Sequence, residues 1–327
     1  MNHLPTDLPA ASVVSATSRP SGYFVAKEGL SLVRDNGENL NILGFGLSTD
    51  PSSAKSIAHF EFLERFWSFY PACSGLVDVK SRVPAYEWPD TLKQTTVAAG
   101  SVMLGFKEKG SKRDATGLAC GTSIDDAAER AVLELCERHL LARFWCKDDI
   151  SLSLFRTHSL EEEGVVAEYF AIEEDPPLPF CIVTLKVEGG LWVVGSAMGR
   201  TLTRAADKAF LEAAMLFDSM SQKHLSAYNS QTANGRYERY VSGGFEKAEE
   251  TFLGKVNRRG LQRKWELERE DPLEVIVTRV LGEEASKILI TPIIRQSEYT
   301  IVSAFSAGAL KPSDFRKDEN ELTDPFF

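Results

Sequence analysis

The sequence predicts a single α/β domain in which one strand–turn–helix unit occurs three times. The prediction rests on an internal repeat and on the local pattern within each copy. The copies read GFGLSTDPSSAKSIAHFEFLERFW from Gly44, GLACGTSIDDAAERAVLELCERHL from Gly117 and GSAMGRTLTRAADKAFLEAAMLF from Gly195. A glutamate follows the helix alanines in each copy, and these glutamates are 73 and 78 residues apart. That spacing is too long for a solenoid repeat and suits a supersecondary unit used within one domain.

Each copy begins with a pattern typical of a strand that ends at a turn. Residues 191–197 form an apolar run of strand length, and residues 39–45 are a weaker version of it. A glycine follows in every copy, at Gly46, Gly121 and Gly199. We expect these glycines to supply the conformational freedom that the chain needs to leave the strand.

A helix is predicted after each turn. The expected N-caps are Ser52 or Ser53 in the first copy, Ser123 or Asp125 in the second and Thr203 in the third. Alanines four residues apart then form a smooth stripe that lets each helix lie close to a sheet or another helix. These alanines are Ala54 and Ala58, Ala127 and Ala131, and Ala205 and Ala209.

The composition bounds the class of protein and its surroundings. The chain has 327 residues, of which 43% are hydrophobic, as expected for a soluble globular protein. Residues 1–21 resemble neither a secretory signal nor a membrane anchor and predict a flexible segment, so the domain is expected over residues 22–327. Five cysteines without CxxC spacing indicate reduced thiols and a cytoplasmic location. A net charge of −10 argues against a nucleic-acid partner, and no apolar stretch is long enough to cross a membrane.

The predicted helices carry glutamates at matching positions. An isolated ExxER sequence is usually a solvated helix face with an ion pair, but three copies in register favour a site. Two carboxylates on one packed face repel each other unless a cation or an arginine neutralises them. Clustered carboxylates are the ligands that hard cations prefer, and Mg²⁺ is the cation that accompanies nucleotide phosphates. The residues are Glu61 and Glu64 with Arg65, Glu134 and Glu137 with Arg138, and Glu212.

Other chemistries are not supported by the sequence. There is no GxxxxGK[ST] loop of a Walker-type ATPase and no GxSxG elbow. The five histidines have no ligand spacing. His59 and His139 lie near the carboxylate-bearing helices, where we expect packed or exposed positions rather than catalysis.

The three copies are also where the chain resembles a known family, the YcaO family. The second copy, extended to TGLACGTSIDDAAERAVLELCERHLLARFW, is close to the most characteristic segment of that family. The first copy resembles its earlier ExxER helix, and residues 195–215 resemble its third helix. The resemblance covers roughly residues 22–320. It implies a single YcaO-like α/β domain whose helices converge on a nucleotide site, with ATP and Mg²⁺ as cofactors.

The resemblance also implies roles for individual residues. Glu61, Glu64, Glu134, Glu137 and Glu212 would be magnesium ligands, and Arg65 and Arg138 would contact phosphate or orient carboxylates. Lys27 and Thr116 are weaker candidates for ATP contacts. Thr116 stands where the family has Asn, and Met215 stands where it has Gln. Many members end in a proline-rich tail whose carboxylate reaches the site, and here the chain ends in TDPFF. The carboxylate of Phe327 is therefore the candidate catalytic base.

The function implied by the resemblance is ATP-dependent activation of backbone amides in a ribosomally made precursor peptide. A cyclodehydratase (heterocyclase) of this kind forms thiazoline or oxazoline rings from Cys, Ser or Thr, as in bacteriocin biosynthesis. Thioamide or amidine formation, an accessory role in ribosomal-protein modification and a non-catalytic scaffold subunit remain alternatives. The expected partners are the precursor peptide and a separate leader-peptide-binding, E1-like protein, and a homodimer is a further expectation.

Overall fold

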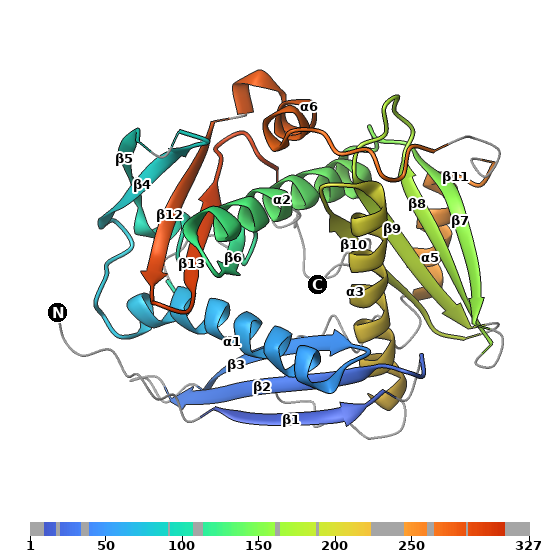
Figure 1. Ribbon diagram of the computed structural model, residues 1–327, viewed down its shortest axis with the longest axis horizontal. Helices are drawn as coiled ribbons and strands as arrows, with labels where there is room; N and C mark the ends of the chain where they lie inside the picture. Colours follow the sequence, from blue (N-terminus) through green and yellow to red (C-terminus); the bar gives the residue numbers. More distant parts are fainter. Residues whose placement is uncertain are drawn as a thin grey trace.

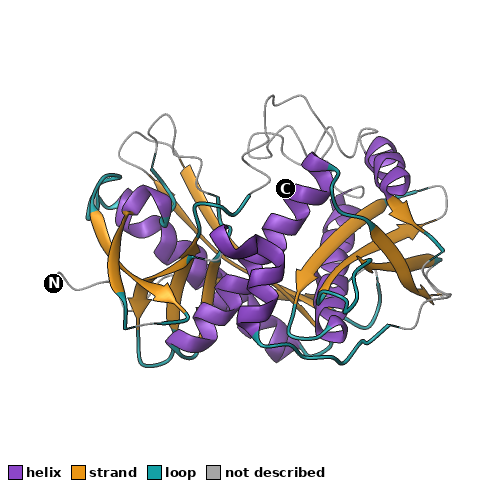
Figure 2. Ribbon diagram, turned by 90° about the horizontal axis from the view of Figure 1, so that it is seen from above, coloured by secondary structure: helices purple, strands orange, loops and turns teal. Residues whose placement is uncertain are grey.

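In the part of the chain that the structure describes, three long helices lie in the middle of the molecule with strands on both sides (Figure 1, Figure 2). They are α1, Pro51–Cys73, α2, Ile124–Ala142, and α3, Leu202–Lys223. Two shorter helices are α5, Phe245–Lys255, and α6, Leu273–Ala285. A 3-10 turn spans Ala99–Ser101, and a π-helical turn, Arg143–Lys147, continues α2. This computed structural model describes residues 10–17, 20–33, 39–90, 92–106, 114–160, 164–187, 190–223, 245–259, 265–285 and 287–310.

The described strands form three sheets. The first is antiparallel with the order β1-β2-β3, formed by Ala11–Ala16, Phe24–Val33 and Asn39–Ser48. The second has the order β5-β4-β12-β13-β6, formed by Gln94–Ala98, Arg82–Trp88, Ile288–Arg295, Thr300–Phe305 and Leu118–Gly121. The third has the order β10-β9-β8-β7-β11, formed by Trp192–Met198, Phe180–Val187, Val165–Ile172, Leu152–Leu160 and Val256–Asn257.

The three predicted strand–turn–helix units are present, and each belongs to a different sheet. The strand that precedes α1 is β3, the strand that precedes α2 is β6, and the strand that precedes α3 is β10. Each of these strands lies at the edge of its sheet. An edge strand leaves a row of backbone N–H and C=O groups without partners in the sheet. The three units therefore bring three sheet edges and three helices together.

The glycines of the units allow close packing, which corrects the role expected for them. The backbone angle φ is not positive at Gly46, Gly121 or Gly199, so these turns do not require a glycine conformation. A Cβ atom added at Gly46 would lie 2.1 Å from the backbone oxygen of Ala54. One added at Gly121 would lie 2.5 Å from the backbone nitrogen of Ala127. These glycines are needed because the helix backbone touches the strand, and the alanine stripe is the matching surface on the helix.

The helix starts agree only in part with the sequence prediction. Ser123 caps α2 by accepting a hydrogen bond from the backbone N–H three residues later, at 3.1 Å, as expected. In the other two helices the side chains that cap in this way are Asp50, at 2.7 Å, and Thr201, at 3.2 Å. The expected Ser52, Ser53 and Thr203 are wrong because they already lie inside the first helical turn.

One described part of the first 21 residues forms a strand that the sequence did not predict. Ala11–Ala16, which falls within the segment predicted to be flexible, forms β1 and pairs with β2 along its whole length. All six of its side chains are exposed, so the backbone ladder rather than burial orders this strand. Residues 1–9 lie outside the described part of the chain.

The main core lies between the third sheet and helices α2, α3, α5 and α6. Its largest fully buried side chains include Phe144, Phe170, Phe180, Trp192 and Phe252. A smaller core lies against α1 and contains Ile42, Phe62 and Phe66. Of the described helices, none has the length and apolar character needed to cross a membrane.

Candidate functional site

The glutamates of α1 are held by the backbone of two sheet edges. The N–H of Phe45 on β3 donates to Glu61 Oε2 at 2.6 Å. The N–H of Cys120 on β6 donates to Glu64 Oε2 at 3.1 Å. Both strands lie at the edge of a sheet, so each supplies an N–H that the sheet itself does not use. The two carboxylates of the first ExxER sequence therefore bridge the first and second units.

The second glutamate of α2 reaches the third unit. Ser196 Oγ on β10 donates a hydrogen bond to Glu137 Oε1 at 2.8 Å. Both side chains are buried, with 1% of Ser196 and 2% of Glu137 exposed. A buried carboxylate is costly unless hydrogen bonds or charges compensate it, so this contact fixes Glu137 in place.

The two predicted arginines lie beside the first glutamate of each pair. Arg65 Nη2 is 2.5 Å from Glu61 Oε1, and Arg138 Nε is 3.9 Å from Glu134 Oε1. Both pairs are four residues apart on one helix, the spacing that brings side chains together on a helix face. Both pairs are partly exposed, and each arginine keeps donors that can contact a further anion.

Electrostatic interactions connect the glutamates across the three helices. The pKa of Glu64 is raised well above its usual value by burial and then by the carboxylates of Glu134 and Glu61. The pKa of Glu212 is raised to about 8 by burial and by Glu137, although Lys208 partly offsets this shift. Repulsion between Glu64 and Glu134 thus acts between α1 and α2, and repulsion between Glu212 and Glu137 acts between α2 and α3.

Arg138 occupies the centre of this charge pattern. Burial alone would lower its pKa, but the carboxylates of Glu137, Glu134 and Glu212 raise it, and Asp114 adds to the effect. Arg138 therefore remains fully charged. The structure thus brings all five predicted glutamates into one electrostatically coupled group, which we call the glutamate cluster: Glu61, Glu64, Glu134, Glu137 and Glu212.

The donor set of the glutamate cluster suits a divalent cation, but the side chains do not form a complete coordination shell. Among the described residues, no three His, Cys, Asp or Glu side chains lie close enough together to hold a metal ion. Burial, and then the neighbouring carboxylates, raises the pKa values of Glu64 and Glu212, so a further positive charge would be needed to hold both in the charged form. A cation bound here would need further oxygen ligands from another molecule.

The other predicted site residues lie at different distances from the cluster. Thr116 is buried, and its N–H donates to Asp114 Oδ1 at 3.0 Å; Asp114 in turn helps to raise the pKa of Arg138. Lys27 is exposed on β2, and its Nζ lies 5.8 Å from the centre of the Phe45 ring. Its neighbours Ala26 and Glu28 are buried beside α1, so Lys27 faces the other side of the sheet. Phe327 lies outside the described residues.

Several groups that interact with the glutamate cluster or with Arg138 were not predicted from the sequence. Ser196 and Asp114 are the clearest, since one binds Glu137 and the other interacts with Arg138. Neither residue recurs at the corresponding position of the other two copies, so the repeat gives no signal for it. Lys208 was detectable, because it lies four residues before Glu212 on the same helix face.

The two histidines near the cluster have structural surroundings, as expected. His59 is exposed, and its Nδ1 lies 2.8 Å from the buried Glu28. His139 is buried, and its Nδ1 accepts a hydrogen bond from the Leu310 N–H at 3.0 Å. Burial and the nearby Arg143 lower the pKa of His139 to about 4, so the ring is neutral at pH 7.

Comparison with known proteins gives similarity in structure but not in sequence. No family model matches the chain, and no curated protein matches it. The solved structure of YcaO from Methanopyrus kandleri, bound with AMPPCP and Mg²⁺, is 15% identical with a TM-score of 0.58. The match covers 91% of the present chain and 85% of that chain.

Two further structures are similar over most of the chain. The E. coli microcin synthetase McbBCD complex is 13% identical with a TM-score of 0.66, over 94% of this chain and 89% of that one. A heterocyclase in complex with substrate and cofactor is 12% identical with a TM-score of 0.61, over 88% of this chain. The match covers 48% of that heterocyclase, so the chain spans about half its length. These similarities confirm the expected α/β fold: the chain has the fold of the YcaO and heterocyclase structures.

Proposed function

We propose that this protein uses ATP to activate backbone amides of a ribosomally made peptide and forms azoline rings as a cyclodehydratase. The observation that carries the proposal is the arrangement of the glutamates of three helices: Glu61, Glu64 and Glu137 are hydrogen-bonded to edge strands, and Glu212 interacts electrostatically with Glu137. Packing alone gives no reason to collect five carboxylates around two arginines, since like charges repel and burial penalises them. A polyanionic ligand bound together with a cation does give such a reason.

Mg²⁺ and ATP are the ligands that fit this cluster best. Mg²⁺ binds through a few carboxylates together with substrate phosphates, which agrees with a protein that supplies only part of the coordination shell. The structurally similar M. kandleri YcaO was solved with an ATP analogue and Mg²⁺. In this proposal the glutamate cluster would hold Mg²⁺ beside the nucleotide, and the ion would supply positive charge that offsets the charge of the carboxylates and phosphates.

The chain's own residues would position the nucleotide. Arg65 and Arg138 have free guanidinium donors beside the cluster and would contact phosphate oxygens bidentately. Thr116 lies next to this group and would contact the nucleotide from the loop before β6. Lys27 is not included, because it faces the side of the first sheet opposite to α1. The carboxylate of Phe327 remains a proposed proton acceptor.

The reaction needs ATP because an amide oxygen is a poor leaving group. A Cys, Ser or Thr side chain of the peptide attacks the carbonyl carbon of the preceding amide, and its proton passes to a base. This attack closes the ring. The former carbonyl oxygen then takes the γ-phosphoryl group of ATP and leaves as phosphate, while the amide nitrogen loses its proton and the C=N bond of the azoline forms. The peptide loses one water per ring, and ATP becomes ADP and phosphate.

We further propose that the protein acts in the cytoplasm with partners. The substrate is a precursor peptide, and a separate E1-like protein captures its leader segment. The similar heterocyclase was solved with substrate, and the microcin synthetase was solved as a complex. A homodimer is a further proposal that light scattering of the purified protein can test.

The test is a reconstituted reaction. The full chain is mixed with ATP, Mg²⁺, the leader-binding protein and the Cys/Ser/Thr-rich peptide encoded near its gene, and both ADP and peptide mass are measured. We expect ADP release coupled to the loss of one water per ring. A thioamide or amidine product has a different mass and would replace the azoline assignment. The absence of ATP turnover with every cognate peptide and partner would overturn the proposed activity.

A non-catalytic scaffold is the second candidate function. Met215 favours it, because this side chain packs against the main core one helical turn after Glu212 and offers no polar group to a ligand. A scaffold of this kind would support ring formation by a partner without turning over ATP itself. The same reconstitution distinguishes the two, because changing Glu134 and Glu137 to Gln would leave ring formation intact only if the chain is a scaffold.

A further inference from the structure

A second concave site lies on the other side of α2 from the glutamate cluster. It has a volume of about 630 Å³ and lies between β4, the first turns of α2 and the start of α6. Its α2 wall includes Asp125, Ala128 and Glu129. With 3.6 residues per turn, Glu137 lies about 180° around the helix axis from Ala128. Figure 1 shows α6 on one side of α2 and α1 on the other. This cavity is therefore separate from the glutamate cluster.

The cavity is lined by more negative than positive charge. Among the described residues, Arg200 is the one cation that lines the cavity, with Nε 3.1 Å from Glu270 Oε1 and 3.6 Å from Glu129 Oε1. Two carboxylates thus share one guanidinium. Asp125 and Glu274 also line the cavity, and they form no ion pair among the described residues.

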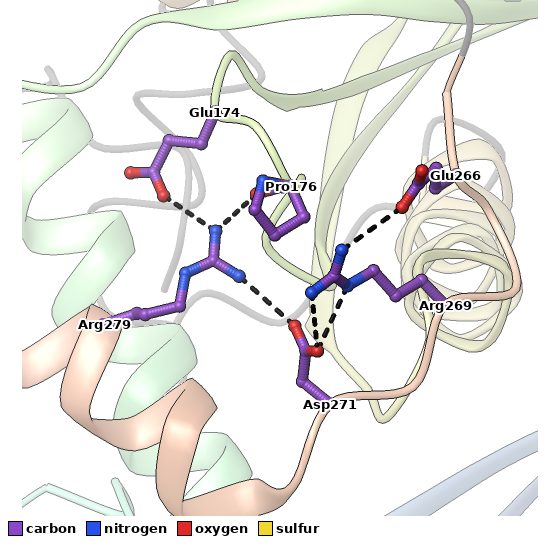
Figure 3. A network of polar contacts seen from close by, with 6 residues as sticks. All are labelled: Glu174, Pro176, Glu266, Arg269, Asp271 and Arg279. Carbon is purple, nitrogen blue, oxygen red and sulfur yellow. Dashed lines mark hydrogen bonds and ion pairs between the residues drawn. The ribbon is translucent and has the colours of Figure 1, made fainter.

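A network of ion pairs fixes the wall that α6 and its preceding loop contribute (Figure 3). Asp271, which lines the cavity, lies 3.1 Å from Arg269 Nη2 and 3.4 Å from Arg279 Nη1. Arg279 also reaches Glu174 at 3.1 Å and donates to the backbone oxygen of Pro176. The charge of Asp271 is balanced within this network. Neither Arg269 nor Arg279 forms an ion pair with Glu270 or Glu274 among the described residues.

Aromatic rings form the opposite wall. Tyr86 and Trp88 on β4 line the cavity together with Ile290 on the adjacent strand. The guanidinium of Arg295 lies 5.9 Å from the centre of the Tyr86 ring, so this ring already supports a cation in the structure. Aromatic faces attract guanidinium and ammonium groups, and they also cover the apolar stems of these side chains.

We propose that this cavity binds the cationic side chain of an arginine or lysine in a peptide. Its aromatic wall fits the stem and its unpaired carboxylates fit the charged head, which is the chemistry that an organic cation requires. The volume lies within the usual range for ligand sites and has room for adjacent residues of the peptide. The proposal does not depend on ATP chemistry, because α2 separates the two sites.

The test is a calorimetric titration of the full chain with acetyl-Arg-Arg-amide, carried out without nucleotide or Mg²⁺. We expect saturable one-to-one binding that weakens as NaCl is added. The double variant Asp125→Asn/Glu274→Gln is expected to weaken binding at least about tenfold, because two charge-assisted contacts are lost. Acetyl-Lys-Lys-amide tests which of the two cations is preferred.

The controls separate this cavity from general attraction to an acidic protein. Glu246→Gln removes an exposed first-turn carboxylate from α5, away from the cavity, and is expected to leave binding unchanged. The citrulline-matched peptide keeps the shape without the charge and is expected not to bind. Equal binding of the citrulline peptide, equal loss in Glu246→Gln, or full binding by the double variant would each overturn the proposal. Because no ATP is present, these outcomes are independent of the proposed enzymatic activity.

Discussion

Ser196 Oγ donates a hydrogen bond to Glu137 Oε1 at 2.8 Å, and this contact joins the third unit to the second. The Cys120 N–H holds Glu64 at 3.1 Å in the corresponding way and joins the second unit to the first. In both helices the second glutamate of the ExxER sequence is thus held by the strand of the next unit. These second glutamates are therefore held by contacts between units, whereas Glu61 is held by the Phe45 N–H of its own unit.

The first prediction concerns Ser196→Ala. The change leaves a buried Glu137 oxygen without its donor, so we expect the free energy of unfolding to fall by about 1–3 kcal/mol. If Glu137 binds Mg²⁺, loss of the group that orients it should weaken Mg-ATP binding about 10–100-fold. Urea denaturation and calorimetry measure the two effects.

The matched control is Ser159→Ala, which removes an exposed hydroxyl from β7 and should change neither quantity. A double-mutant cycle with Glu137→Gln isolates the pair itself. If the losses in the free energy of unfolding of the two single variants add up to the loss in the double variant, the hydrogen bond contributes nothing to stability.

The second prediction concerns the close approach of β10 and α3. In Gly195→Ala the new Cβ would lie 2.3 Å from the Ala209 backbone oxygen, so the helix must move away from the strand. We expect a loss of about 1–3 kcal/mol in the free energy of unfolding. Gly254→Ala in α5 is the control, because its Cβ would meet no atom within 4 Å and alanine favours a helix. Equal stability of the two variants would contradict this packing.

The third prediction is a loss of stability in acid that arises from His139. Its pKa is about 4 in the folded protein, against 6.5 for the free side chain, so the unfolded chain binds the extra proton. The contribution is fully present above pH 6.5 and is lost as the pH falls toward 4. It amounts to about 3 kcal/mol, at about 1.4 kcal/mol for each pKa unit.

His139→Gln removes the titrating ring and keeps an acceptor for the Leu310 N–H. We expect the unfolding free energy of this variant to depend less on pH between 4 and 6.5 than that of the unchanged protein. His158→Gln, at an exposed position on β7, should keep the original dependence. An unaltered pH dependence in His139→Gln would place the acid sensitivity elsewhere.

The repeat made the fold and much of the site predictable. Glycine, alanine and glutamate recur at matching positions because each copy must pack a helix on a strand and direct carboxylates to one place. The strands expected at residues 39–45 and 191–197 are confirmed as parts of β3 and β10. Electrostatic interactions link the five glutamates across the three helices, and their role as magnesium ligands stays a prediction.

Contacts between units could not be predicted, because they depend on how the sheets are arranged. Ser196 faces Glu137 only once β10 lies beside α2, and nothing in its local sequence indicates this. The role of the glycines was wrong for a related reason. A local pattern shows that a glycine is present, but only the packed helix shows that its missing Cβ matters.

The most direct test of the central claim is calorimetric titration of the purified chain with Mg-ATP. We expect micromolar binding to the unchanged protein and no measurable binding to the double variant Glu134→Gln/Glu137→Gln. Glu250→Gln, an exposed position on α5, serves as the matched control and should bind normally. Unchanged affinity in the double variant, or no binding by the unchanged protein, would contradict the assignment of the glutamate cluster as a Mg-ATP site.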